Sequence, residues 1–186
     1  MTVPRELRTE RLVLRPFDAG DAPELLPLLE TNVDHLSRWI PEHVWRPLPL
    51  DELATRLSGF AENFGADRQW RYAIRLIDDD TLVGEVDLFT RSAAGRVPYP
   101  EADRAEIGYW VRADYTGRGL ATEAARAMLA LAASLPRIEH VVIRCDALNA
   151  PSGAVPQRLG FALTDSEQDG ADTLHVWSLP LRAPSS

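Results

Sequence analysis

A glycine-rich turn between a strand pattern and a helix pattern constrains this chain more than any other feature. The turn reads Thr116-Gly117-Arg118-Gly119-Leu120-Ala121. Side chains alternate in period two before it, and apolar residues recur at helical spacing after it. Backbone amides in such a turn can point together toward one place at the start of the helix. The turn predicts either an anion-binding site or a bend that only needs residues with positive φ.

Alternation, apolar spacing and helix-capping residues predict the other elements. We expect strands at residues 11–15, 70–76, 82–89, 104–112, 141–143, 161–164 and 173–179. We expect helices behind Asp21, behind Asp51, behind the glycine turn and before Gly160. Pro27 predicts a kink or a short first turn in the first helix. Residues 41–50 read as an ordered loop, 141–143 as a strand buried on both faces, and 183–186 as a frayed end.

Composition restricts the class of partner. With 186 residues, 45% of them hydrophobic, the chain has the size of one domain spanning residues 1–186. Its 28 acidic and 20 basic residues give a formal charge of −8, which argues against nucleic acid and would attract a cationic substrate.

Targeting and metal-binding patterns are missing from the sequence. No apolar stretch has the length and purity of a membrane span or a signal peptide. The only cysteine, Cys145, has no partner for an internal disulfide, and no cysteine or histidine cluster has metal-ligand spacing. We therefore expect no membrane association, no metal and a cytoplasmic location.

The glycine turn does not match the common nucleotide-binding loops. A nucleoside-triphosphate loop needs a lysine and a hydroxyl residue after its last glycine, whereas Gly119 is followed by Leu120 and Ala121. The dinucleotide fingerprint lacks its third glycine. A phosphate-bearing ligand of another kind is left.

The stretch "YTGRGLATEA" resembles the acetyl-CoA pyrophosphate loop of the GNAT acetyltransferase superfamily, with Thr116 where the family has Gln or Arg. Four further stretches are similar, in the family's order, to the branch that acetylates the N-termini of ribosomal proteins (the RimJ/RimL type). They are "LRTERLVLRPFDAGDAPEL", "HLSRWIP", "AEIGYWV" and "NAPSGAVPQRLGF".

The resemblance implies an α+β fold: a mixed, mostly antiparallel sheet of six to seven strands flanked by about four helices. The sheet would splay between its fourth and fifth strands. Acetyl-CoA would lie in that opening, with its pantetheine arm along the backbone of Trp110, Val111 and Arg112. Asn149 and Ser152 would contact the same arm. The pyrophosphate would be held by Thr116, Gly117, Arg118, Gly119, Leu120, Ala121 and Thr122.

Acetyl transfer requires a neutral amine, and an α-amine titrates at about 7.7–8.0 against about 10.4 for lysine. Glu106 is the candidate base because it matches the glutamate that serves some family members through water. The alternative is a strand glutamate that is solvated or paired with an arginine, such as Arg104 or Arg144. Pro156 stands where many members have the tyrosine that protonates the leaving thiolate.

Three residues are candidate replacements for that tyrosine: Ser152 first, then Cys145 and Tyr109. The thiolate could also leave without protonation, since a thiol titrates near about 8.5.

Trp39 and Glu85 are the main candidates for the acceptor side of the site. The wider set that could line it also includes His35, Trp45, Asp87 and His175. The favoured acceptor is the N-terminal α-amine of a protein or peptide, acetylated by direct attack in a ternary complex. Two alternative functions stay open: acetylation of a small-molecule amine (an antibiotic or polyamine) and a non-catalytic acyl-CoA-binding module. A homodimer also stays open.

Overall fold

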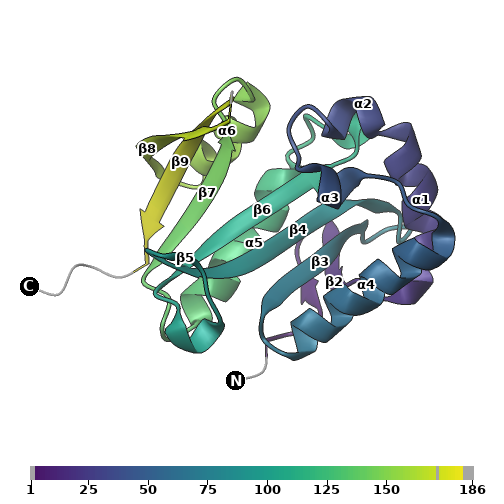
Figure 1. Cartoon of the computed structure of the whole chain (residues 1–186), viewed down its shortest axis with the longest axis horizontal. Coiled ribbons are helices and arrows are strands. Elements are labelled where there is room, and N and C mark those ends of the chain that lie inside the picture. Colours follow the sequence, from purple (N-terminus) through teal and green to yellow (C-terminus); the bar gives the residue numbers. More distant parts are fainter. Residues whose placement is uncertain (1–2, 171, 182–186) are drawn as a thin grey trace, which may run out of the picture.

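One mixed sheet runs through the molecule, and helices cover both of its faces (Figure 1). The computed structural model describes residues 3–170 and 172–181, so the expected frayed end at 183–186 lies outside the described residues. The strands are β1 (Leu7–Arg8), β2 (Leu12–Pro16), β3 (Gln69–Leu76), β4 (Leu82–Ser92), β5 (Gly95–Arg96), β6 (Arg104–Val111), β7 (His140–Asp146), β8 (Ala162–Asp169) and β9 (Asp172–Pro180). The α-helices are α1 (Ala22–Thr31), α2 (Val33–Leu36), α3 (Glu42–Trp45), α4 (Leu50–Gly65), α5 (Leu120–Ser134) and α6 (Ala150–Arg158).

The strand order is β1-β2-β3-β4-β6-β7-β9-β8, with β5 paired to β4. Each neighbouring pair is antiparallel except β6 and β7, which run parallel. The predicted fold class is therefore confirmed. In the described part of the chain the sheet has nine strands instead of six to seven, because β1 and β5 have two residues each, too few to produce an alternating pattern.

Two hydrophobic cores lie on opposite faces of the sheet, as the period of two requires. Trp70 and Tyr72 of β3 contribute to the core beneath α5, whereas Ala73 of the same strand joins the core beneath α1 and α4. Leu53 and Leu57 on α4 are fully buried in the second core. Burying each such leucine stabilises the fold by about 1.5–3 kcal/mol.

Two local predictions fail for identifiable reasons. Residues 41–50 are not entirely a loop, since the short helix α3 forms between two of their prolines. The strand at 141–143 is not buried on both faces: Val142 is half-buried because none of the described helices covers that side of β7 (Figure 1). Pro27 lies inside α1, which stays helical to Thr31, and the kink or short first turn expected of it stays a prediction.

Asp21 does not cap α1 with its side chain, although it precedes that helix. Its carboxylate is buried and accepts hydrogen bonds from Arg15 at 2.5 Å and from Arg75 at 3.0 Å. Arg75 also contacts Glu24 at 2.6 Å. The ion-pair network thus ties the start of α1 to β3, which a local capping pattern cannot reveal.

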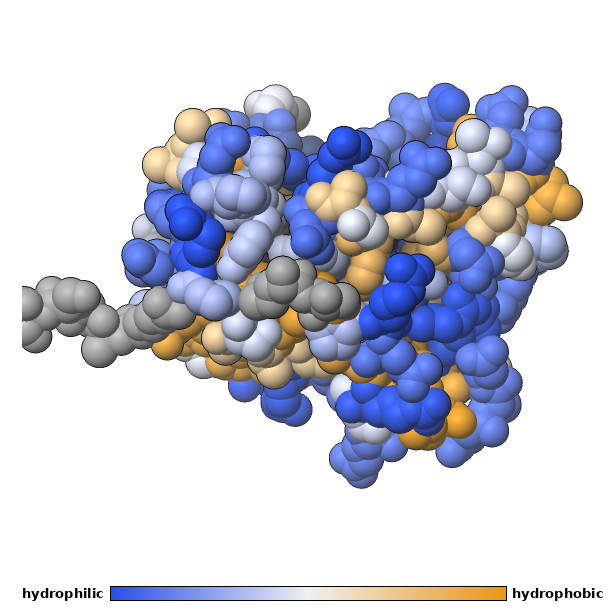
Figure 2. Space-filling view, turned by 90° about the horizontal axis from the view of Figure 1, so that it is seen from below, coloured by the Kyte–Doolittle hydropathy of each residue, from blue (hydrophilic) through white to orange (hydrophobic). Residues whose placement is uncertain are grey.

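Within the part of the chain that the structure describes, no helix is both long and apolar enough to cross a membrane. Seen from below in Figure 2, hydrophilic residues cover much of the surface and hydrophobic ones show in smaller areas between them.

Candidate active site

The parallel strands β6 and β7 separate soon after they meet. They pair only at Arg104 with His140, Ala105 with Val141 and Glu106 with Val142, and beyond Glu106 they diverge. The predicted splay is therefore present. A cavity of about 1700 Å³ extends from this opening to the glycine turn and to the helices on the other side of β6. That volume exceeds the usual ligand pocket of about 300–1000 Å³ and leaves room for two substrates.

The glycine turn brings backbone amides to the start of α5. Gly117 and Gly119 adopt φ of 74° and 80°, so both explanations of the turn, positive φ and anion binding, remain compatible with it. Among the described residues, no acceptor pairs with the backbone N–H groups of residues 117–122. These N–H groups lie at the positive end of the helix dipole, where a pyrophosphate fits.

Arginines and an acidic anchor hold this turn in place. Arg11 donates from Nη1 to the carbonyl of Arg118 at 2.9 Å and from Nε to Glu123 at 2.7 Å. Glu123 also accepts from the hydroxyl of Thr9 at 2.6 Å. Burial alone would raise the pKa of Glu123, but these hydrogen bonds outweigh it and lower the pKa. The guanidinium of Arg118 lies 4.5 Å from the ring centre of Tyr115 and donates to the carbonyl of Asp114 at 2.8 Å, and Arg118 is not among the described residues that line the cavity.

Of the three residues expected along the pantetheine arm, Trp110 and Val111 end β6 and Arg112 follows the strand. Trp110 is buried, and its indole N–H has no hydrogen-bond partner in the described chain. The carbonyl of Val111 lies 3.2 Å from Nε2 of His35, and the amide of Arg112 donates to Val83 at 2.9 Å. All but Arg112 line the cavity.

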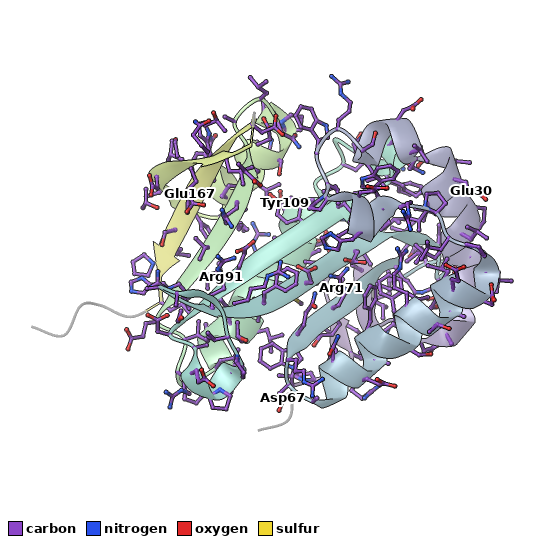
Figure 3. The ribbon with its side chains drawn as sticks, viewed as in Figure 1. Glu30, Asp67, Arg71, Arg91, Tyr109 and Glu167 are labelled. Carbon is purple, nitrogen blue, oxygen red and sulfur yellow. The ribbon has the colours of Figure 1, made fainter. Side chains whose placement is uncertain are left out.

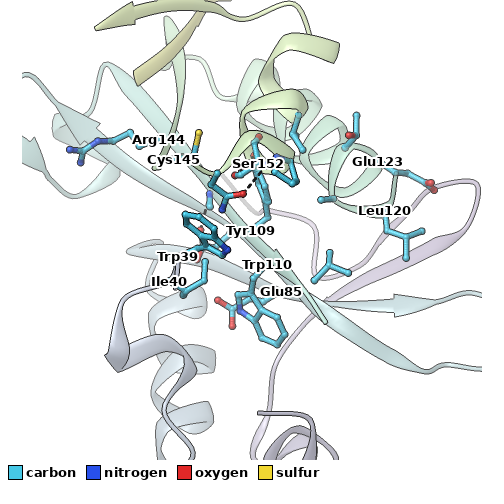
Figure 4. Close-up of a pocket in the computed structure, with 18 of the residues that line it drawn as sticks. Trp39, Ile40, Glu85, Tyr109, Trp110, Leu120, Glu123, Arg144, Cys145 and Ser152 are labelled. Atoms are coloured by element: carbon cyan, nitrogen blue, oxygen red, sulfur yellow. Dashed lines mark hydrogen bonds between the residues drawn. The ribbon is translucent and has the colours of Figure 1, made fainter. Parts of the chain in front are cut away.

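On the β7 side, Asn149 immediately precedes α6, and Ser152, labelled in Figure 4, lies in its first turn. Asn149 caps this helix, because its Oδ1 accepts from the amide of Ser152 at 3.2 Å. The hydroxyl of Tyr109 reaches across the opening, donating to the carbonyl of Ser152 at 3.0 Å and lying 3.2 Å from its Oγ. Burial raises the pKa of Tyr109, so its hydroxyl stays protonated near neutral pH. Cys145 lines the same wall, and burial raises the pKa of its thiol.

Glu106 lies in the cavity wall and forms an ion pair with Arg91 of β4. The pairing alternative is thus realised with an arginine other than Arg104 or Arg144. Arg104 binds Asp103 at 3.0 Å, and Arg144 pairs with Glu167. This pairing leaves the role of Glu106 as a base a prediction.

The acceptor side is lined by Trp39, Glu85, Asp87 and His35, whereas Trp45 and His175 are not among the described lining residues. Figure 4 shows Trp39 facing the region of Tyr109 and Ser152. Glu85 is 5% exposed and binds Nη1 of Arg71 at 2.6 Å. The Arg71 guanidinium also lies 4.2 Å from the ring of Phe60.

Arg71 and Gly108 were not singled out from the sequence. Arg71, labelled on β3 in Figure 3, stands in one row across the sheet with Asp87 of β4 and Gly108 of β6. The pattern that could have revealed this row is a charged residue at position 71 within a strand of apolar neighbours, followed by two acids at spacing two on the next strand.

A family model described as "Acetyltransferase (GNAT) domain" matches residues 11–162. A protein of Bacillus subtilis (strain 168), provisionally named as the ribosomal N-acetyltransferase YdaF, is 27% identical over 167 residues. The match spans 87% of this chain and 83% of that protein.

Two solved structures share the fold at lower identity. The ribosomal L7/L12 α-N-protein acetyltransferase RimL, in complex with coenzyme A, matches with a TM-score of 0.77 and 20% identity over 97% of this chain and 98% of that one. The microcin C7 self-immunity acetyltransferase MccE, in complex with acetyl-CoA and AMP, matches with a TM-score of 0.79 and 18% identity over 92% and 93%.

Proposed function

The chain belongs to the GNAT acetyltransferase family and uses acetyl-CoA as its acyl donor. From this premise we propose that it acetylates the N-terminal α-amine of a protein or peptide. One observation carries the proposal: a single cavity joins the free amides at the start of α5 to a wall of buried carboxylates on β4. The first group suits the pyrophosphate of the donor, and the second suits a cationic amine.

Relatives support a protein acceptor without deciding it. YdaF carries a name that refers to ribosomal proteins, and RimL is described as acting on the α-amine of L7/L12. MccE, whose complex includes AMP, keeps a small-molecule acceptor open.

The described residues contain no group of histidine, cysteine and carboxylate side chains placed to hold a metal.

The chemistry needed at the opening is limited. The amine attacks the thioester carbonyl directly, and the leaving sulfur takes a proton or departs as thiolate. Ser152 and Tyr109 form a hydroxyl pair that lines the cavity, so we assign the proton donation to Ser152 with Tyr109 behind it. Pro156 lies buried on α6 and has no proton to give.

A screen for coenzyme A release tests the proposal. We expect turnover with peptides that have free N-termini and none with the same peptides after N-terminal blocking. Turnover only with amine metabolites would support the small-molecule alternative. Donor binding without turnover on any amine would support a binding module.

Replacing Ser152 with alanine should lower kcat by about tenfold, a small effect for general acid catalysis because the thiolate is already a fair leaving group. The loss should be visible in initial rates at pH 6.5 with saturating acetyl-CoA. Ser58→Ala, a serine on α4 whose hydroxyl bonds only within its helix, is the matched control. An unchanged rate for Ser152→Ala would remove Ser152 from the reaction.

A further inference from the structure

We propose that Asp87, and not Glu106, binds the ammonium group of the acceptor and removes its proton before the amine attacks the thioester. The inference rests on the proposed function and adds to it the residue that makes the amine reactive.

The Asp87 side chain reaches from β4 to the neighbouring strand β6, where its carboxylate contacts the backbone. Its Oδ1 accepts the amide hydrogen of Gly108 at 3.1 Å, and a Cβ built on Gly108 would lie only 2.5 Å from that oxygen. Glycine is therefore needed at 108 for this contact. Glu106 and Trp110 follow the same face of β6 on either side of Gly108, and all of these residues line the cavity. The carboxylate thus stands beside the strand that borders the splayed opening.

The charges around Asp87 do not balance. Glu85 and Asp87 are each 5% exposed, and among the described residues Arg71 is the arginine that contacts both. Arg71 hydrogen-bonds Glu85 at 2.6 Å but lies 3.6 Å from Asp87, beyond hydrogen-bond distance. The Asp87 carboxylate is consequently the one whose charge is least compensated, and a bound ammonium group would complete the pairing.

The more distant charged groups act in both directions. Glu106 of β6 repels the Asp87 carboxylate, although Arg91 pairs with Glu106. Arg96, whose guanidinium lies 3.8 Å from the ring centre of Phe89, attracts the Asp87 carboxylate. Burial raises the pKa of Asp87 most. The charge of Arg71 opposes this shift, those of Glu85 and Glu106 add to it, and the resulting pKa is about 7.

This value suits an α-amine better than a lysine. An α-ammonium group loses its proton at about 7.7–8.0, so transfer of that proton to Asp87 is nearly balanced. The pKa of a lysine, about 10.4, lies about three units above that of Asp87, so a lysine would keep its proton. A base of this strength therefore favours peptide N-termini over side-chain amines.

Trp110, which lines the same cavity as Asp87, gives a second and independent indication of a ligand. Trp110 is 6% exposed, and its indole N–H is buried with no acceptor in the described part of the chain. Buried donors without a partner are costly and rare in folded proteins. A carbonyl oxygen of a peptide whose N-terminus sits at Asp87 would satisfy this group.

The proposed steps balance as follows. The ammonium group gives one proton to the Asp87 carboxylate and becomes a neutral amine. Its nitrogen forms a bond to the thioester carbon, the carbon–sulfur bond breaks, and the second amine proton ends on the sulfur. The proton on Asp87 returns to solvent, so one acetyl-CoA and one ammonium group yield one amide, coenzyme A and one proton.

The test compares Asp87→Asn with Glu106→Gln in peptide acetylation between pH 6.5 and 8.5, with Asp78→Asn as the control. The asparagine keeps an oxygen for the Gly108 amide, and Asp78 lies exposed in the β3–β4 turn outside the cavity lining. We expect Asp87→Asn to lower kcat/KM by about tenfold at pH 6.5, where only about 5% of an α-amine is neutral. The loss should shrink toward pH 8.5, where most of the amine is neutral, and Glu106→Gln should show no such trend.

An unchanged rate for Asp87→Asn, or a loss equal at every pH, would overturn the proposal. Melting curves and acetyl-CoA binding establish that the variant is folded. Should it not fold, the wild-type profile decides: kcat/KM must rise with a midpoint near 7 for a peptide whose α-amine titrates at about 8. A rise that follows the amine alone would contradict the assignment. Failure of the wild type to acetylate any N-terminal peptide would instead refute the proposed function.

Discussion

Replacing Gly119 with valine is expected to weaken acetyl-CoA binding by at least about a hundredfold, or about 3 kcal/mol. The residue adopts φ of 80° immediately before α5. A β-branched side chain is strongly disfavoured at this φ, so the backbone must shift. The shift would redirect the amides of the turn away from their common point and reduce their combined attraction for a pyrophosphate. Calorimetric titration with acetyl-CoA measures the loss.

Gly95→Val is the matched control for this prediction. Gly95 has φ of 120°, and like Gly119 it has space for a Cβ, but it lies in the short hairpin between β4 and β5. It should suffer similar backbone strain and keep its affinity for the donor. Undiminished affinity of folded Gly119→Val would show that the turn does not bind the pyrophosphate.

Replacing Arg71 with methionine should lower the free energy of unfolding by about 3–5 kcal/mol at pH 8, the cost of leaving buried carboxylates without a counter-ion. Burial raises the pKa of Glu85 and of Asp87, and Arg71 lowers both. Without Arg71 these carboxylates take up protons more readily, so the variant should recover part of its stability as the pH falls toward 5. Urea unfolding at pH 8 and pH 5 measures both effects.

Arg68→Met provides the comparison, because Arg68 is exposed at the start of the same strand region. It should change stability by no more than about 0.5 kcal/mol. The double variant Arg71→Met with Glu85→Gln should be more stable than Arg71→Met alone at pH 8. Equal losses for Arg71→Met at both pH values would mean that packing on Phe60, and not charge, accounts for its contribution.

The fold followed from the sequence wherever the signal was local. Alternation placed β3, β4 and β6, and the glycine turn placed the start of α5. The failures involve contacts between distant segments. Asp21 looked like a helix cap because nothing nearby in sequence indicates that Arg75 reaches it. Val142 looked fully buried because an apolar residue does not reveal whether a helix covers its face of the sheet.

In the candidate site, too, one part depends on a local stretch of sequence and the other on contacts between distant segments. The expected donor side rests on residues 116–122, one continuous stretch whose backbone the glycines determine, so the sequence alone is enough to propose it. The acceptor side depends on register across three strands. Glu106 meets Arg91, and Asp87 stands between Arg71 and Gly108, only because β3, β4 and β6 pair with one alignment. From the sequence, Asp87 could therefore be placed only in the wider set of residues that line the acceptor side.

The most direct test of the account uses one peptide that carries both a free N-terminus and an internal lysine. After incubation with acetyl-CoA at pH 7.5, tandem mass spectrometry locates the acetyl group. The account predicts acetylation at the α-amine and an unmodified lysine. Acetylation of the lysine alone, or of neither amine while a small-molecule amine is acetylated, would contradict it.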